Sequence, residues 1–130
     1  MFRRVDDSFW ASPQIAPADV EAARALGVRV IVNNRPDGEQ PGQAPGEEIK
    51  AAAEAAGLAY VAAPVRGGPT EAAVQALTEA LAQGPVLAYC GSGTRSMLVW
   101  AIAQIVSGAR TRDETVALGR NAGFDLARWI

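Results

Sequence analysis

The most constraining feature of this sequence is a helix-length run, residues 96–106, that is apolar on nearly every side. A helix without a polar face cannot lie at a protein surface, so other elements must cover it in the middle of the fold. A short apolar run at residues 86–89, shortly before this helix, is typical of a buried strand. The chain therefore contains a buried strand that leads through a short loop into a buried helix.

Strand and helix patterns alternate along the rest of the chain. Dense β-branched residues at 28–32 predict a strand buried on both faces, and the apolar run 58–63 predicts the next strand. Residues 3–12 predict an edge hairpin. Apolar spacing and capping residues predict helices over 17–26, 46–56 and 71–82, and one that starts at the capping-box pair Thr111 and Glu114. This alternation predicts an α/β fold, with a mostly parallel sheet of four to five strands and helices on both faces.

Length and composition narrow the class of protein. The 130 residues are enough for one domain, 1–130, with a core of its own. A net charge of −2 without a basic segment argues against nucleic-acid binding. The longest apolar run is too short to cross a bilayer and the N-terminus lacks a signal-peptide pattern, so we expect a cytoplasmic protein that does not associate with membranes.

Histidine is absent and cysteine occurs once. These counts exclude an intrachain disulfide, a histidine-based catalytic triad or dyad, and a histidine-ligated metal site. We expect no metal and no cofactor. If the chain is an enzyme, backbone dipoles and arginine must activate its nucleophile.

The single cysteine, Cys90, stands where the buried strand ends and a glycine-containing loop begins. Gly91 and Gly93 allow backbone N–H groups to turn inward as an anion-binding nest, toward which the following helix dipole points. Arg95 adds a planar cation suited to an oxyanion, and together these features favour a thiolate. Ser92 and Thr94 complete the candidate anion loop. An inert core cysteine beside an ordinary turn is the alternative.

Two other loops, 33–45 and 65–69, are expected at the same sheet edge, because the carboxyl ends of parallel strands form a common crevice. Arg35 could widen the positive field over the site. Asp37 and Glu39 are candidate proton donors, although solvated turn carboxylates show the same pattern. Asn33 and Asn34 are expected to organise the first loop by hydrogen bonds to its backbone.

Four segments carry a family resemblance: Ser12–Ile15, Val32–Glu39, Pro64–Val65 and Leu87–Ser96. In these segments the sequence resembles the phosphatase-like domain found alone and in beta-lactamase hydrolase-like proteins, a bacterial branch of the dual-specificity protein tyrosine phosphatase fold. The resemblance implies a protein tyrosine phosphatase-like fold in which Cys90 is the nucleophile. It also implies that Arg95 clamps the oxyanion and that the Ser96 hydroxyl supports the thiolate.

Two departures from tyrosine phosphatases bear on the chemistry. Only four residues, Gly91 to Thr94, separate Cys90 from Arg95, one fewer than in those enzymes. The loop at 65–69 contains no carboxylate to protonate a leaving group, a step worth about 10²–10⁴ in rate. A six-residue loop resembles that of rhodanese-like sulfurtransferases, in which the thiolate carries a sulfane sulfur as a persulfide and needs no general acid.

Three functions therefore remain open. We expect first a rhodanese-like sulfurtransferase, which takes a sulfane sulfur onto Cys90 from a small anionic donor and passes it to a thiol acceptor or a partner protein. The alternative is a phosphatase that hydrolyses phosphate esters through a phosphocysteine. The third is a non-catalytic module that binds an oxyanion or a protein.

Overall fold

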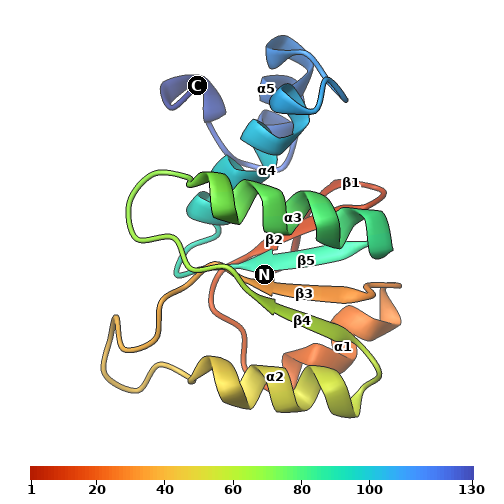
Figure 1. Cartoon of the computed structure of the whole chain (residues 1–130), viewed down its shortest axis with the longest axis vertical. Coiled ribbons are helices and arrows are strands. Elements are labelled where there is room, and N and C mark those ends of the chain that lie inside the picture. The colour runs from red at the N-terminus through yellow and green to blue at the C-terminus, as the bar shows by residue number, and fades with distance from the viewer.

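The computed structural model describes residues 1–130, and a five-stranded sheet forms its centre (Figure 1). The strands are β1 (Arg3–Asp6), β2 (Phe9–Ser12), β3 (Val30–Asn33), β4 (Ala59–Ala62) and β5 (Val86–Tyr89). They lie in the order β1-β2-β5-β3-β4. Only the β1–β2 hairpin is antiparallel, and the other three strand pairs are parallel. The predicted mostly parallel α/β sheet with an edge hairpin is confirmed.

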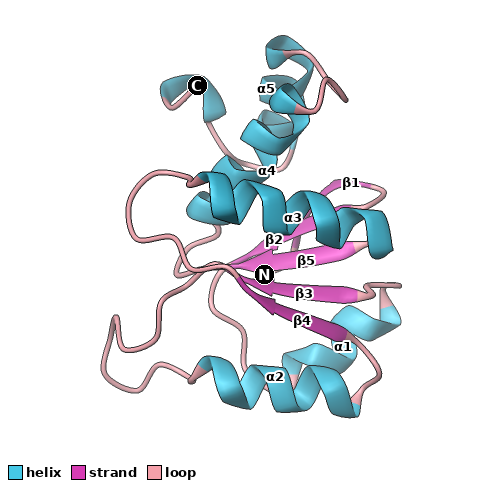
Figure 2. Ribbon diagram, viewed as in Figure 1, coloured by secondary structure: helices cyan, strands magenta, loops and turns pink.

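Helices cover both faces of the sheet, as predicted (Figure 2). The helices are α1 (Asp19–Ala25), α2 (Gly46–Ala55), α3 (Glu71–Gln83), α4 (Thr94–Val106) and α5 (Arg112–Asn121), followed by the short 3₁₀ turn η1 (Leu126–Arg128). Helices α1 and α2 lie on one face, and α3 and α4 lie on the other. Helix α5 and η1 pack against α4 on the side away from α2.

The sheet separates two apolar cores. The larger contains 21 buried residues and lies between the sheet and α3, α4 and α5, whereas the smaller contains 11 and lies under α1 and α2. Successive side chains of β5 alternate between them: Val86 and Ala88 belong to the larger core, and Leu87 and Tyr89 to the smaller. Tyr89 therefore points away from the face on which α4 begins.

Helix α4 is buried along most of its length, as its apolar sequence predicts. Its buried side chains are Ser96, Met97, Leu98, Val99, Trp100, Ala101, Ala103 and Gln104. Trp100 stacks on Phe9 of β2 with 5.7 Å between ring centroids. The helix begins at Thr94, two residues earlier than predicted, because Gly93 adopts a left-handed backbone (φ 96°) that ends the loop there.

Capping residues begin two other helices where the sequence predicts. The Thr70 hydroxyl accepts a hydrogen bond from the Ala73 N–H at 3.1 Å at the start of α3. Thr111 and Glu114 form the complete reciprocal capping box at the start of α5.

None of the helices has the length and apolar character needed to cross a lipid bilayer.

Candidate functional site

Cys90 follows β5 at the carboxyl edge of the sheet, directly before α4. Backbone hydrogen bonds join the three loops at this edge. The Asn34 N–H donates to the Tyr89 carbonyl at 2.8 Å, and the Val65 N–H donates to the Asn34 carbonyl at 2.9 Å. Since β3, β4 and β5 are parallel, their following loops meet beside Cys90.

The Cys90 side chain is fully buried beneath its own loop. Its Sγ accepts a hydrogen bond from the Gly93 N–H at 3.0 Å, and the left-handed backbone of Gly93 turns that N–H inward. An amide that donates to sulfur at the start of a helix stabilises negative charge on it. A Cβ at Gly93 would lie 3.3 Å from the ring of Phe124, so both space and backbone favour glycine there.

Arg95 folds back over the loop rather than pointing into solvent. Its Nη1 donates to the Val65 carbonyl at 2.8 Å, and its side chain is 22% exposed. A Cβ on Gly91 would lie 3.2 Å from Arg95 Nη2, so the guanidinium lies directly against the cysteine loop. The pKa of Arg95 is raised chiefly because Glu39 accepts its hydrogen bonds, and the charge of Cys90 raises it further, against partial burial.

Glu39 bridges the two candidate anion-binding arginines. Its carboxylate accepts from Arg95 Nη1 at 2.8 Å and Nη2 at 2.9 Å, and from Arg35 Nε at 3.0 Å. The hydrogen bond with Arg95 is the main reason that the pKa of Glu39 is lowered to about 2, and Arg35 contributes further while burial opposes. Glu39 is therefore ionised at neutral pH and acts here as a hydrogen-bond acceptor.

Asp37 lies just before Glu39 in the same loop, and its carboxylate faces the start of α2. Its Oδ1 accepts a hydrogen bond from the Gly46 N–H at 2.9 Å, in the first turn of that helix. Asp37 also lines a cavity of about 220 Å³ together with Arg35, Arg66 and Tyr60. The structure therefore gives Asp37 a role in holding the loop against α2.

Ser96 lies in the first turn of α4 and is fully buried. Its hydroxyl donates to Asn34 Oδ1 at 2.8 Å, and Asn34 Nδ2 donates to the Ala63 carbonyl at 2.9 Å. Asn33 Oδ1 accepts the Arg35 N–H at 2.8 Å. The predicted bonding to the backbone of the first loop is found for Asn33. The Asn34 side chain instead joins this loop to Ala63 after β4 and to Ser96 in α4, links across the sheet edge that the sequence did not reveal.

Gln14 is a site residue that residue-level sequence reasoning missed. Its Oε1 accepts a hydrogen bond from Arg35 Nη1 at 3.0 Å, and its backbone N–H faces the Gly91 carbonyl at 3.4 Å. The available signal was its position: it follows β2, which is parallel to β5 and ends at the same edge.

Ser92 and Thr94 form the outer side of the cysteine loop. Their hydroxyls hydrogen-bond to each other at 3.2 Å. Thr94 also lines a cavity of about 230 Å³ with Phe124 and Trp129 of the C-terminal segment. The side chains of these two loop residues are thus directed to each other, whereas the backbone N–H of Gly93 between them faces the sulfur.

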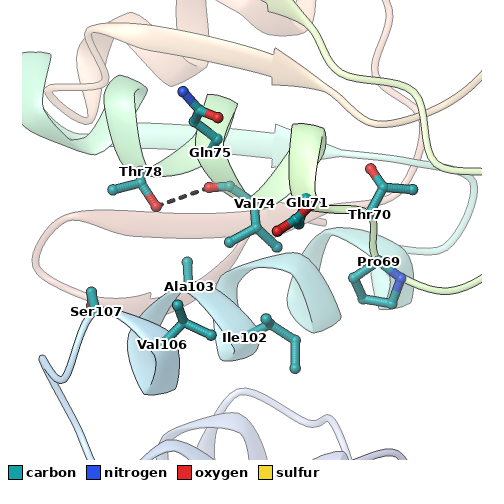
Figure 3. A pocket seen from close by; sticks show the side chains of 10 residues that line it. All are labelled: Pro69, Thr70, Glu71, Val74, Gln75, Thr78, Ile102, Ala103, Val106 and Ser107. Carbon is teal, nitrogen blue, oxygen red and sulfur yellow. Dashed lines mark hydrogen bonds between the residues drawn. The ribbon is translucent and has the colours of Figure 1, made fainter.

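A cavity of about 720 Å³ lies between α3 and α4 and contains none of the predicted site residues (Figure 3). Its lining includes Val74 of α3, and Ile102 and the 75%-exposed Val106 of α4. The structure contains no group of three or more histidine, cysteine, aspartate or glutamate side chains that could hold a metal ion.

Comparison with protein families confirms the resemblance. Residues 1–107 match the family model described as the phosphatase-like domain of beta-lactamase hydrolase-like protein. The beta-lactamase hydrolase-like protein of Xylella fastidiosa is 48% identical over 107 residues, covering 80% of this chain and 25% of its own. That of Agrobacterium fabrum is 36% identical over 133 residues, covering 98% and 31%. The chain therefore spans a quarter to a third of the length of these relatives.

Comparison with solved structures confirms the predicted protein tyrosine phosphatase-like fold. A Neisseria meningitidis protein, named provisionally as a phosphatase, superposes with a TM-score of 0.82 and 32% identity, covering 97% of this chain and 91% of its own. TpbA of P. aeruginosa, in complex with pTyr, shares the fold at a TM-score of 0.67 and 18% identity, covering 95% of this chain and 75% of its own. These likenesses support the phosphatase alternative and give no support to sulfur transfer, the first expectation.

Proposed function

The chain belongs to the family of phosphatase-like domains of beta-lactamase hydrolase-like proteins, and on that premise we propose that it is a cysteine-dependent phosphatase. One observation carries the proposal: the Cys90 sulfur accepts an amide hydrogen bond at the start of α4, beside the guanidinium of Arg95. A thiolate in that position is a nucleophile with a cation and an inward-facing backbone N–H, that of Gly93, next to it. The name of the Neisseria relative supports the same class of reaction.

The reaction has two steps. The Cys90 thiolate attacks phosphorus, the bond from phosphorus to the ester oxygen breaks, and a phosphocysteine forms. Water then attacks the same phosphorus and releases inorganic phosphate and the thiolate. The backbone of Gly91–Thr94, together with Arg95 and Arg35, holds the phosphoryl oxygens in both steps. We propose that the Ser96 hydroxyl, which donates to Asn34 in this structure, donates to the sulfur when it leaves in the second step.

The site offers no proton donor to the leaving group. The loop between β4 and α3 contains no carboxylate, Glu39 is ionised and paired with two arginines, and Asp37 accepts from Gly46. The leaving oxygen therefore receives no proton from the protein, and an aryl oxide departs under that condition far more readily than an alkoxide. We infer that the substrates are aryl phosphates, and the pTyr complex of TpbA is a structural precedent within this fold.

A comparison of p-nitrophenyl phosphate with an alkyl phosphate tests this function. We expect wild-type protein to release nitrophenol and rapidly quenched protein to carry one phosphoryl group on Cys90 by mass spectrometry. Cys90→Ser removes both signals, whereas Glu48→Gln, an exposed change on α2, keeps them. Hydrolysis that survives in Cys90→Ser, or no hydrolysis of any aryl phosphate between about pH 5 and 8, would refute the proposal.

Sulfane-sulfur transfer is a second candidate, favoured by the four-residue spacing of the loop and the lack of a proton donor. The thiolate would attack the outer sulfur of a donor S–S bond, the donor would leave as sulfite or a thiolate, and an acceptor thiolate would then take that sulfur from Cys90. No proton donor and no oxidant are needed. Mass spectrometry after exposure to thiosulfate or polysulfide distinguishes the two, because this chemistry adds one sulfur atom to Cys90 and no phosphoryl group.

A purely binding module would show neither adduct. In that case phosphate or sulfate would still protect Cys90 from alkylation, and catalysis would be absent with every donor. The same preparation of protein therefore separates all three functions.

A further inference from the structure

The anion site contains a carboxylate that belongs to the protein itself. Glu39 Oε1 accepts from Arg95 Nη2 and Arg35 Nε, and Glu39 Oε2 accepts from Arg95 Nη1, all between 2.8 and 3.0 Å. The three side chains are 7%, 22% and 27% exposed for Arg35, Arg95 and Glu39. They therefore form a compact ion cluster, partly shielded from water, directly beside the cysteine loop.

The charges of this cluster nearly cancel. Two guanidiniums and one carboxylate leave a single positive charge, and a thiolate at Cys90 would offset it. The neighbouring cavity adds no positive charge, because Arg66 there is accompanied by Asp37 and Glu47. With the thiolate included, these side chains have no net charge before an anion enters. A dianion would therefore add two uncompensated negative charges to a site of reduced dielectric, whereas a monoanion would add only one.

The carboxylate is held in place by its own loop. The Glu39 N–H donates to Gln43 Oε1 at 3.0 Å, and Gln43 Nε2 donates to the Pro36 carbonyl at 2.9 Å. Arg95 uses both Nη atoms for Glu39, and its Nη1 also donates to the Val65 carbonyl. An oxyanion that enters the cysteine loop would therefore meet a guanidinium whose charge Glu39 already offsets.

We propose that Glu39 is a specificity-determining residue that restricts the Cys90 site to groups with one negative charge. This inference rests on the proposed function and deepens it: the substrate is the monoanion of an aryl phosphate ester, or a diester, rather than the dianion. With Glu39 removed, the two arginines would present an excess positive charge and the preference would move toward dianions. Because Glu39 stays ionised at every pH at which the protein is used, only a variant can reveal this effect.

Phosphate and sulfate provide a matched pair of probes. At about pH 5.5 inorganic phosphate carries mainly one negative charge and sulfate carries two, although both are tetrahedral and similar in size. The affinity of each anion is measured by how far it slows alkylation of Cys90 by iodoacetamide, a neutral reagent. In the wild-type protein we expect phosphate to bind more tightly than sulfate, and the opposite order would by itself overturn the proposal.

Glu39→Gln keeps the size of the side chain and one acceptor oxygen but removes its charge. We expect sulfate to bind at least about tenfold more tightly to this variant, and phosphate to change by less than about threefold, as a unit charge within a few ångströms requires. Glu48→Gln, which removes the same charge outside the site, should leave both affinities unchanged. Glu39→Asp, which keeps the charge, should keep the wild-type order.

An unchanged ratio of the two affinities in Glu39→Gln would overturn the proposal. So would an equal loss of both affinities, since Glu39 would then only position Arg95.

These measurements of anion affinity do not depend on turnover. A protein that fails to hydrolyse aryl phosphates but shows the expected anion order refutes the proposed function alone, and the converse result refutes the charge restriction alone.

Discussion

Asn34 illustrates how one buried side chain can join the parts of a site. It is fully buried, its backbone contacts Tyr89 at the end of β5, and its side chain contacts Ala63 after β4. Its Oδ1 also accepts the hydroxyl of Ser96 in α4. Every polar group of Asn34 thus has a partner, and the partners come from β5, from the segment after β4 and from α4.

Asn34→Ala should destabilise the protein by about 1–3 kcal/mol, because it leaves the Ser96 hydroxyl and the Ala63 carbonyl buried without partners. Urea unfolding monitored by circular dichroism measures this change. Asn121→Ala, at an exposed position in α5, is the matched control and should change stability by less than about 0.5 kcal/mol. Equal effects of the two variants would contradict the assigned role of Asn34.

Glu39 should make stability depend on pH in the acid range. Its pKa is lowered to about 2 in the folded protein from an ordinary value of 4.5, so its contribution is complete above about pH 4.5 and disappears as the pH falls through about 2. Unfolding of wild-type protein and Glu39→Gln should differ by on the order of 1–3 kcal/mol at pH 7, given the partial exposure of the carboxylate. The difference should approach zero near pH 2, and a difference independent of pH would count against the ion cluster.

At the scale of elements, the C-terminal segment buttresses the cysteine loop from outside the sheet. Leu126 of η1 is 1% exposed and lies against Gly119 of α5, where an added Cβ would come within 2.4 Å of Leu126 Cδ1. The Phe124 N–H donates to the Gly119 carbonyl at 2.8 Å, and the Phe124 ring lies against Gly93. A small residue at 119 therefore lets α5 position a ring against the loop that holds Cys90.

Gly119→Ala should displace η1 and lower stability by about 1–3 kcal/mol through overpacking. Because Phe124 would move with η1, we also expect faster alkylation of the buried Cys90 by iodoacetamide. Ala117→Ser, on the exposed side of the same helix, should leave both quantities unchanged. Destabilisation without any change in the alkylation rate would show that the C-terminal segment does not support the loop.

For the whole molecule, two apolar layers share one sheet. Strand β5 lies between the two cores, since Val86 points into one and Leu87 into the other. If the packing on one face were lost, the strands that support the core on the other face would be loosened as well. The fold should therefore unfold in a single transition.

Tryptophans on each side of the sheet test this cooperativity. Trp10 lies in the smaller core and Trp100 in the larger, while Trp129 is 59% exposed. In a Trp129→Phe background, variants that retain only Trp10 or only Trp100 should each show fluorescence and circular dichroism midpoints that coincide. Leu77→Ala and Ile49→Ala, one in each core, should each cost about 2–5 kcal/mol and move both probes together. Separate midpoints for the two sides would show independent unfolding.

Local patterns were sufficient for most of the fold. The strand at residues 86–89, the capping box at Thr111 and the N-cap at Thr70 depend on residues within a few positions, so periodicity and capping chemistry identify them. The β4 strand is shorter than predicted by one residue at each end, and α1 starts two residues later. The first and last residues of an element depend on how far hydrogen bonds to neighbouring elements continue along it. Local sequence patterns contain no information about those bonds.

The amino-acid order by itself determined that Cys90 ends a buried strand, that two glycines follow it, and that Arg95 and Ser96 begin a buried helix, because these are neighbours along the chain. Only the tertiary structure decided the strand order, the contact of Glu39 with Arg95 across 56 positions, and that of Asn34 with Ser96 across 62. Pairing at such separations is set by which strands lie next to each other and by how two cores pack on one sheet. For that reason a candidate proton donor in the sequence became, in the folded protein, the counter-charge of the anion site.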